Sequence, residues 1–445
     1  MVKIDIYKLK RVYFIGIGGI SMSALAKILI NLGIHVSGSD LKESEQTEEL
    51  SKLGATIYIG ENANNLKNDI DLVVYTGAVQ KTNKEYQKAL KLGLPIVERS
   101  EFLGAVANMY NNVISIGGTH GKTTTTALIG EIYNNAKKSP TIHIGGVASF
   151  GNLQVGDREV FITEACEYLN SFAHLNSSTV LITNIEADHL DYYRNLDEIK
   201  KAFLNFANNS NKYVITFEND WIFGKLNKFV TYYSCGFDEK YDFYAYNIDA
   251  FNGGYAFDVK FQGEFLGRFI IKIPGIHNVK NALCAIATTY VNGISLDIIS
   301  KSVYEFKGVG RRYELIGEID GAKIIADYAH HPTEILNSIS AFKGKKVLCV
   351  FQPHTYSRTK ALKKEFSTAF NAAKKLIIYK TYPAREEYME EGSEEALFKS
   401  CKHKNKELVL EKEVLINMIK AECKNFDIVL VLGAGDIYKI VKNGL

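Results

Sequence analysis

The sequence predicts an α/β protein built of three domains, and three observations support this. The chain has 445 residues, more than one hydrophobic core usually accommodates. Short β-like runs alternate with helix-length segments toward both ends of the chain, as in doubly wound folds. Between these regions, a strand-like run ends in a glycine-rich turn that opens another helical segment.

Residues 1–110 are predicted to form a Rossmann-like N-terminal domain. A strand-like run at 12–15 leads through a glycine turn into a helical pattern at 21–32. Further strand-like runs lie at 72–75 and 95–97. Strands separated by helix-length segments predict a parallel sheet with crossover helices.

Residues 111–308 are predicted to form a central P-loop ATPase-like α/β domain. Its strand-like runs include 113–116, 160–163 and 180–183. The stretch 241–273 instead alternates aromatic and β-branched residues between glycine-containing turns. That pattern predicts an antiparallel sheet added to the central domain.

Residues 309–445 are predicted to form a Rossmann-like C-terminal domain. Its strand-like runs at 323–325, 347–351 and 428–432 are separated by helical segments. The Val309-Gly310 step is the expected hinge between this domain and the central one.

The composition is that of an ordinary globular protein, with 46% hydrophobic and 23% charged residues. A formal net charge of +3 is too near neutral to indicate nucleic-acid or membrane-surface binding. The six cysteines are scattered singly, unlike a disulfide framework or a zinc site. No apolar run approaches the ~18 residues that span a bilayer, and no signal-type segment opens the chain. We expect a cytoplasmic monomer or homodimer with no nucleic-acid or membrane partner.

The most informative segment is Gly117-Gly118-Thr119-His120-Gly121-Lys122-Thr123, which follows an apolar run and opens a helical pattern. Such a turn points backbone N–H groups and a helix N-terminus at one anion. Lys122 can reach the outer phosphates of a nucleotide, and Thr123 can ligate Mg²⁺. The loop is one residue shorter than usual, and a tight turn of small residues is the alternative. The predicted ATP loop comprises Gly117, Gly118, Thr119, His120, Gly121, Lys122, Thr123 and Thr124.

A second glycine turn lies in the N-terminal domain, where Asp40 closes the second strand-like run. In dinucleotide folds a diphosphate binds at such a turn, and an acidic side chain lies near a ribose. The motif is weak because Ser21 takes the third glycine position, so a turn that binds nothing is the alternative. Beside an ATP-type loop, a nucleotide-linked substrate explains this turn better than a redox cofactor. The predicted residues are Gly16, Ile17, Gly18, Gly19, Ile20, Ser21, Asp40 and Arg99.

Glu164 and His189 each follow an apolar strand-like run, where open α/β sheets place ligands. With Thr123 they are candidate Mg²⁺ ligands, although a hard cation favours Glu164 over His189. A hydrogen-bonded histidine without a metal is the alternative for His189. Asn278 and Asn281 share a helix face, and they either recognise an adenine edge or cap the helix.

Glycine-, histidine- and carboxylate-containing motifs follow one another through the chain at 16–23, 118–123, 164–168, 183–189, 310–312, 327–332, 351–354 and 433–437. Together they resemble the Mur ligase family, and the resemblance runs from about residue 11 to about residue 440. The shortened phosphate loop resembles that of the whole superfamily, which includes the folylpolyglutamate synthetases. The Gly-Gly-Ile opening and the Tyr-Ala-His-His-Pro segment resemble the branch that adds L-alanine.

The resemblance implies an ATP- and Mg²⁺-dependent ligase whose small-molecule substrates are UDP-N-acetylmuramate and L-alanine. The N-terminal domain would bind the UDP, the central domain the ATP and the C-terminal domain the amino acid. The lactyl carboxylate would attack the γ-phosphorus of ATP, and the alanine amine would then displace phosphate from the acyl phosphate. The implied catalytic residues are Lys122, His330 and Arg358, with Thr123, Glu164 and His189 at Mg²⁺ and with Asn278, Asn281, Arg312 and Asp327 at the nucleotide.

Some alternatives stay open at the level of the sequence. His330 either deprotonates the alanine amine or only positions a substrate carboxylate. A ligase that attaches a recycled tripeptide to the same UDP-sugar is the nearest rival function. An NAD-dependent dehydrogenase using the Gly16 turn and a non-catalytic nucleotide-binding regulator belong to other classes.

Overall fold

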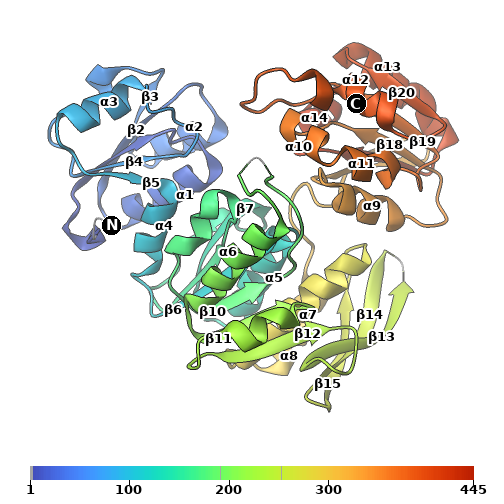
Figure 1. Cartoon of the computed structure of the whole chain (residues 1–445), viewed down its shortest axis with the longest axis horizontal. Helices are drawn as coiled ribbons and strands as arrows, with labels where there is room; N and C mark the ends of the chain where they lie inside the picture. Colours follow the sequence, from blue (N-terminus) through green and yellow to red (C-terminus); the bar gives the residue numbers. More distant parts are fainter. Residues whose placement is uncertain (1–3, 191, 252) are drawn as a thin grey trace.

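The computed structural model describes residues 4–190, 192–251 and 253–445, and it contains three sheets (Figure 1). Each sheet falls within one of the three predicted sequence ranges. The predicted architecture of three α/β domains is therefore confirmed. In Figure 1 the N-terminal domain (blue) and the C-terminal domain (orange to red) lie on either side of the central domain (green to yellow).

The N-terminal domain is a five-stranded parallel sheet. Its strands in sheet order are β3 (Thr56–Ile59), β2 (His35–Asp40), β1 (Arg11–Ile15), β4 (Leu72–Tyr75) and β5 (Ile96–Glu98). Its helices are α1 (Ile20–Asn31), α2 (Glu45–Lys52), α3 (Lys84–Lys91) and α4 (Arg99–Ala107), with 3-10 turns η1 (Ile6–Lys8) and η2 (Ala63–Asn65). The strand order reverses at β1, and in such sheets the crevice at that carboxyl end binds ligands. The Gly16 turn between β1 and α1 lies at that end.

The central domain has a ten-stranded sheet in the order β15-β14-β13-β12-β11-β10-β6-β9-β7-β8. Its strands are β6 (Asn112–Gly117), β7 (Thr141–Ala148), β8 (Gly151–Gln154), β9 (Val160–Glu164), β10 (Ser177–Ile182), β11 (Ser210–Phe217), β12 (Thr231–Gly236), β13 (Phe243–Phe251), β14 (Gly254–Phe261) and β15 (Glu264–Ile271). Its helices are α5 (Lys122–Asn135), α6 (Leu196–Asn208), α7 (Ile276–Val291) and α8 (Leu296–Glu305), with 3-10 turns η3 (Tyr168–His174) and η4 (Asp220–Lys225).

The predicted antiparallel strands of the central domain are present as β13, β14 and β15. They continue the parallel sheet edge to edge, because β13 pairs with β12 at Cys235 and Phe243. At the opposite edge, β8 pairs antiparallel with β7. The parallel strands between these edges bring the carboxyl ends of β6, β9 and β10 to one side of the sheet.

The C-terminal domain has a six-stranded sheet in which only the β16–β17 pair is antiparallel among the described strands. Its strands in sheet order are β16 (Glu314–Ile319), β17 (Ala322–Asp327), β21 (Ile428–Leu432), β18 (Val347–Phe351), β19 (Lys375–Tyr379) and β20 (Lys406–Val409). Its helices are α9 (Pro332–Ser340), α10 (Tyr356–Ala361), α11 (Lys363–Ala369), α12 (Glu394–Ser400), α13 (Lys412–Glu422) and α14 (Ile437–Gly444), with 3-10 turns η5 (Glu390–Gly392) and η6 (Cys423–Asn425). The central strands are apolar along their whole length because helices cover both faces.

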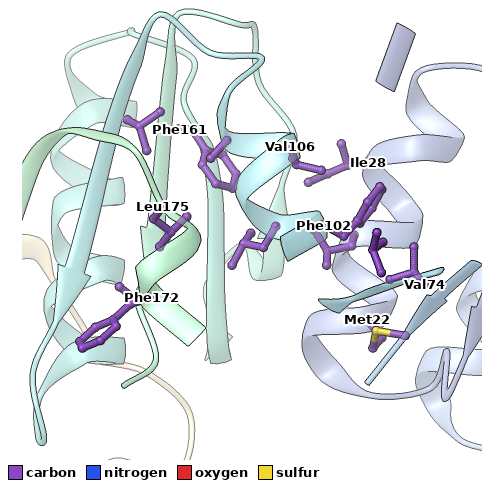
Figure 2. Close-up of a cluster of buried hydrophobic side chains, with 14 of the residues drawn as sticks. Met22, Ile28, Val74, Phe102, Val106, Phe161, Phe172 and Leu175 are labelled. Atoms are coloured by element: carbon purple, nitrogen blue, oxygen red, sulfur yellow. The ribbon is translucent and has the colours of Figure 1, made fainter. Parts of the chain in front are cut away.

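One buried apolar cluster joins the N-terminal and central domains, and Figure 2 shows it. Helix α4 supplies Phe102 and Val106 to this cluster. The labelled neighbours are Met22, Ile28 and Val74 from the N-terminal domain and Phe161, Phe172 and Leu175 from the central domain. Because separating the two domains would expose this apolar surface to water, they pack as one unit.

The C-terminal domain has buried apolar clusters of its own, whose members lie between residues 322 and 441. It meets the central domain through polar contacts, such as the Gly310 N–H that donates to the Val147 carbonyl at 2.8 Å. Polar contacts of this kind permit relative domain motion more readily than a shared apolar core does. The hinge at Val309-Gly310 stays a prediction.

Within the described residues, no helix combines the length and the apolar character needed to cross a membrane.

We expect Phe102→Ala to lower the free energy of unfolding by about 3–5 kcal/mol, because Phe102 is fully buried in the shared cluster. Urea denaturation followed by circular dichroism measures the change. Phe229→Ala is the matched control, since that side chain is 94% exposed and its loss should change stability by less than ~0.5 kcal/mol. Equal effects of the two substitutions would contradict the shared core.

Candidate active site

The phosphate loop connects strand β6 to helix α5, as the sequence predicts. Gly118 and Gly121 have φ values of 137° and 82°, which side chains rarely adopt. A Cβ at Gly118 would also collide with the hydroxyl of Thr183, and one at Gly121 would collide with the Asn281 side chain. The two glycines are therefore required by both backbone conformation and close packing.

The end of strand β10 holds the loop in shape. The Asn184 side-chain oxygen accepts the His120 N–H at 2.9 Å, and the Thr183 hydroxyl donates to the His120 carbonyl at 2.7 Å. An α-helix leaves its first amide groups without intrahelical acceptors, so the first turn of α5 presents N–H groups beside this rigid loop. The arrangement suits a phosphate group.

Lys122, at the start of α5, is held by a carboxylate that the sequence analysis did not assign. Its amine lies 2.9 Å from Glu167 Oε2 and also donates to the Gly118 and Thr119 carbonyls. Burial opposes the charged form, but Glu167 raises the pKa of Lys122 above its ordinary value. The lysine is therefore a cation whose present anion is the protein's own glutamate.

The three candidate metal ligands lie around the same loop. Thr123 lies beside Glu164, whose Oε1 is buried and has no hydrogen-bond partner among the described residues. Burial raises the pKa of the Glu164 carboxyl above its ordinary value, which a nearby cation would reverse. His189 lies 3.8 Å from both Glu167 and Asp188. The structure thus brings Thr123 and Glu164 together and places His189 against two other carboxylates.

The unpartnered Glu164 oxygen and the Thr123 hydroxyl are hard oxygen donors of the type that Mg²⁺ prefers. Gly145 and Gly146 leave room beside them, since a Cβ at Gly145 would lie 3.1 Å from Glu164 Oε2 and one at Gly146 would lie 2.8 Å from Thr123 Cγ2. The residues present therefore fit a magnesium ion.

A cavity of about 130 Å³ lies between the phosphate loop, helix α7 and the C-terminal domain. Asn278 and Asn281 line it and are joined by a 3.1 Å hydrogen bond between their side chains. Asn278 also donates to the Pro274 carbonyl at 2.6 Å, at the start of α7. The residue at the N-cap of α7 is Gly275, which makes no side-chain cap hydrogen bond, so capping of the helix by these asparagines is not seen within the described chain, and contact with an adenine edge stays a prediction.

The C-terminal domain contributes Arg312 and Asp327 to this cavity. Arg312 lies 4.0 Å from Asp327 Oδ1 and 3.6 Å from Glu334 Oε1. The Asp327 carboxylate also accepts N–H groups from Tyr313 and Ala329. Asp327 thus fixes the loop that presents Arg312 toward the phosphate loop.

His120 of the phosphate loop forms the centre of an ion-pair cluster between the two domains. Its ring lies 3.2 Å from Glu334 of the C-terminal domain and 3.6 Å from Glu186 of the central domain. The Thr333 hydroxyl donates to Glu186 at 2.8 Å and closes the cluster. Burial alone would lower the pKa of His120, but the two carboxylates raise it to about 9.

His331 lies beside His120 and Glu186 closely enough for a metal to be considered. Its Nδ1 accepts the Thr333 N–H at 3.3 Å, so the neutral ring carries its hydrogen on Nε2. That Nε2 faces the Ala187 carbonyl at 3.4 Å. The ring therefore acts as a helix cap and a domain contact, which is poorly suited to metal ligation.

A second cavity of about 390 Å³ lies between the central and C-terminal domains, and Arg358 lines it. The Arg358 Nε donates to Asp188 at 3.1 Å, and its Nη1 donates to the His354 carbonyl at 2.7 Å. Although burial opposes ionisation, Arg358 holds the pKa of Asp188 well below its ordinary value. The Arg358 side chain therefore reaches across the interface between the two domains, and some of its N–H groups already donate to acceptors within the protein.

His330 lies next to this second cavity, with its ring 5.7 Å from that of His354. The His330 Nδ1 is 2.9 Å from the Tyr328 carbonyl, which can only accept, so Nδ1 carries the hydrogen and Nε2 has the lone pair. Burial lowers the pKa of His330 to about 3 despite the nearby Glu334. The ring is therefore neutral at pH 7 and able to accept a proton at Nε2.

The N-terminal loop keeps its predicted position between β1 and α1. Gly16 has a φ of 83°, and its N–H donates to the Ser39 carbonyl at 2.8 Å. Asp40 accepts the Gly18 N–H at 2.8 Å, so this carboxylate shapes the loop itself. Arg99 Nη1 lies 3.3 Å from the Ser21 hydroxyl, which brings these two predicted residues together.

Several site residues were missed by the sequence analysis, and they are mainly carboxylates. Glu167 lies within the motif at 164–168, but the sequence analysis assigned it no role. Glu334 forms a capping box with His331 at the start of α9, and this spacing was a usable signal. Asp188 and Glu186 flank His189 closely in sequence, yet their partners are on another domain.

Together, the phosphate loop and the two interdomain cavities define a nucleotide-using enzyme that works between its domains. Family models match in three consecutive stretches: the catalytic domain of the Mur ligase family over residues 11–111, the Mur ligase middle domain over 116–289 and the Mur ligase glutamate ligase domain over 311–435. The chain belongs to the Mur ligase family. The prediction made from the motifs is thereby confirmed.

The relatives identify a branch of this family. A UDP-N-acetylmuramate–L-alanine ligase of Alkaliphilus metalliredigens is 43% identical over 454 residues, covering 98% of this chain and 97% of the relative. A crystal structure of the UDP-N-acetylmuramate–alanine ligase of Thermotoga maritima matches with a TM-score of 0.82 and 30% identity over 98% of both chains. A Thermotoga maritima MurF ligase in complex with ADP shares the fold, with a TM-score of 0.62, 15% identity and coverage of 92% of this chain and 95% of that one.

We expect the contact between the central and C-terminal domains to weaken as the pH rises from about 6.5 through 9. The pKa of His120 is raised from 6.5 to about 9 by its carboxylates, so its attraction is complete below 6.5 and is lost as the ring deprotonates near 9. Small-angle scattering should show a growing radius of gyration over this interval.

His120→Gln should remove this dependence on pH, because glutamine does not titrate. His35→Gln, at an exposed position on β2, is the matched control and should behave like the wild-type protein. A wild-type radius that does not change between pH 6.5 and 9 would contradict the role given to His120.

Proposed function

We propose that this chain is an ATP-dependent ligase that joins L-alanine to the lactyl carboxylate of UDP-N-acetylmuramate through an acyl phosphate. The observation that carries the proposal is the phosphate loop facing Arg312 of the C-terminal domain across one interdomain cavity, while Arg358 lines a second interdomain cavity together with His189. The relatives at about 40% identity over 98% of the chain support the substrate pair. The reaction is the first amino-acid addition to a peptidoglycan precursor.

In the first step the lactyl carboxylate attacks the γ-phosphorus of ATP, and ADP leaves. In this step the protein mainly aligns the two reactants and neutralises their negative charge. The α5 amides and Lys122 would hold the phosphates, with the Lys122 amine exchanging Glu167 for a phosphate oxygen. Thr123, Glu164 and His189 would hold Mg²⁺, which supplies further positive charge when bound.

In the second step the alanine amine attacks the acyl carbon, and inorganic phosphate leaves. The amine must be neutral to act as a nucleophile, so a proton acceptor is needed beside it. The neutral His330, with its lone pair on Nε2, is suited to accept that proton. Its depressed pKa makes it a weak base in this state, and substrate anions nearby would raise that pKa.

The remaining assignments follow the domains. Asn278, Asn281, Arg312 and Asp327 would contact the nucleotide, and Arg358 would bind the alanine carboxylate. The Gly16 turn would bind the UDP-sugar at the first turn of α1. The six cysteines are free thiols, as expected of an enzyme that works in the reducing cytoplasm.

The rival functions differ in their co-substrates. The dehydrogenase is not favoured, because Mur ligase models match in all three domains, and the tripeptide ligase is not favoured by the named relatives.

Phosphate release with UDP-N-acetylmuramate, ATP, Mg²⁺ and L-alanine, omitting each in turn, tests the proposal. Release that needs a tripeptide in place of alanine would overturn it.

We expect Lys122→Ala to abolish ATP-dependent phosphate release while leaving UDP-sugar binding nearly unchanged, because the two ligands are assigned to different domains. Steady-state phosphate assays and calorimetric titration with UDP-N-acetylmuramate measure the two properties. Joint loss of both would refute this division of labour.

We expect Arg358→Ala to raise the KM for alanine by at least tenfold with little change in the KM for ATP, because it removes the charged fork facing the amino-acid cavity. Arg385→Ala is the matched control, since Arg385 lines the same cavity but is exposed. An equal loss for alanine and ATP would mean that Arg358 serves general folding instead.

A further inference from the structure

A chain of hydrogen bonds crosses from the N-terminal domain to the central domain behind the Gly16 turn. Arg99 Nη1 lies 3.3 Å from the Ser21 hydroxyl, and that hydroxyl lies 3.0 Å from His143 Nε2. On the far side of the ring, His143 Nδ1 lies 2.9 Å from the Thr163 hydroxyl on β9. Asn152 ties the same region together by donating to the Ile20 carbonyl at 2.9 Å.

The direction of every bond in this chain can be deduced from its far end. The Thr163 hydroxyl donates its one hydrogen to the Glu164 carbonyl at 3.0 Å, so toward His143 it can only accept. His143 therefore carries its hydrogen on Nδ1 and its lone pair on Nε2. The Ser21 hydroxyl must then donate to Nε2, and it accepts from Arg99, which has only donors.

The environment of His143 keeps this direction in place. The residue is buried on strand β7, with 3% of its surface exposed. Burial, with help from the positive charge of Arg99, lowers the pKa of His143 to about 3, so the ring stays neutral under working conditions. A protonated ring would have no lone pair for Ser21 and would instead donate from Nε2 to the Ser21 oxygen, which would reverse the direction of that bond.

The consequence concerns how the Gly16 turn meets an anionic ligand. Since the only hydroxyl hydrogen of Ser21 is committed to His143, Ser21 has no side-chain donor left for a phosphate oxygen. Arg99 uses one of its N–H groups on Ser21, and within the described part of the chain its other side-chain N–H groups have no hydrogen-bond acceptor. The side chain beside this turn that is equipped to bind a diphosphate is therefore Arg99, at the first position of α4.

We propose that His143 is a positioning residue for the sugar nucleotide: through Ser21 it orients Arg99, which binds the diphosphate, while the Ser21 hydroxyl acts as a relay. This inference rests on the proposed function, because it takes the N-terminal turn as the UDP-sugar site. It assigns a ligand-binding consequence to a central-domain residue that does not itself belong to the Gly16 turn.

A matched pair of substitutions tests the proposal, because glutamine and asparagine each replace one half of the imidazole. His143→Gln places an amide oxygen near the former Nε2 and can still accept from Ser21. His143→Asn places its amide near the former Nδ1 and loses the Ser21 contact. Titration calorimetry with UDP-N-acetylmuramate should show affinity within about threefold of wild type for His143→Gln and about tenfold weaker binding for His143→Asn.

A double-mutant cycle tests the path through Arg99. Arg99→Ala should weaken UDP-N-acetylmuramate binding by at least tenfold, and adding His143→Asn should then cost no more than about twofold. The dissociation constant for ATP should stay unchanged in all variants, which also reports that the central domain is folded.

The outcomes separate this inference from the proposed function. Equal losses for the glutamine and asparagine variants, or fully additive losses in the Arg99→Ala background, would overturn the role of His143 while wild-type binding stands. Failure of the wild-type protein to bind UDP-N-acetylmuramate would overturn the proposed function and this inference together.

Discussion

The pairing of half-buried cations with the protein's own carboxylates is the constraint on which the site depends. A positive charge taken from water needs a partner, because its burial is costly otherwise. Lys122 has Glu167, Arg358 has Asp188, and His120 has one carboxylate from its own domain and one from the C-terminal domain. Under the proposed function, a substrate phosphate would replace Glu167 at Lys122, and the alanine carboxylate would bind Arg358. The site is thereby preorganised in positive charge while remaining stable in the ligand-free protein.

Two of these pairs hold the C-terminal domain against the central domain, since Arg358 and Glu334 lie on one side and Asp188 and His120 on the other. The side chains of these pairs are only 10–14% exposed, so if the contact opens, each charge needs water or another charged group as its new partner. An acyl phosphate hydrolyses in water, and closure of these two domains is the means by which the fold would exclude it. A polar interface between these two domains thus suits the reaction proposed for the enzyme.

The N-terminal and central domains show the opposite design, because one apolar cluster spans both. Strand β9 belongs to that unit and ends at Glu164, next to the phosphate loop. The hydrogen bonds from Arg99 through Ser21 and His143 end at Thr163, the residue before Glu164. A fixed spacing between the sugar-nucleotide turn and the phosphate loop suits a reaction in which parts of two substrates must meet.

The sequence by itself determined the parts that depend on neighbouring residues: the strand–loop–helix around Lys122, the Gly16 turn, and the parallel sheets with their crossover helices. It did not reveal the β7–β8 hairpin or the half-exposed edge strand β20, because short edge strands lack a continuous apolar pattern. Only the tertiary structure decided which carboxylate faces which cation, since Lys122 and Glu167 are 45 residues apart and Arg358 and Asp188 are 170 apart. Local patterning sets the period of an element, whereas the pairing of charges depends on how segments far apart in the chain come together, within a domain or between two domains.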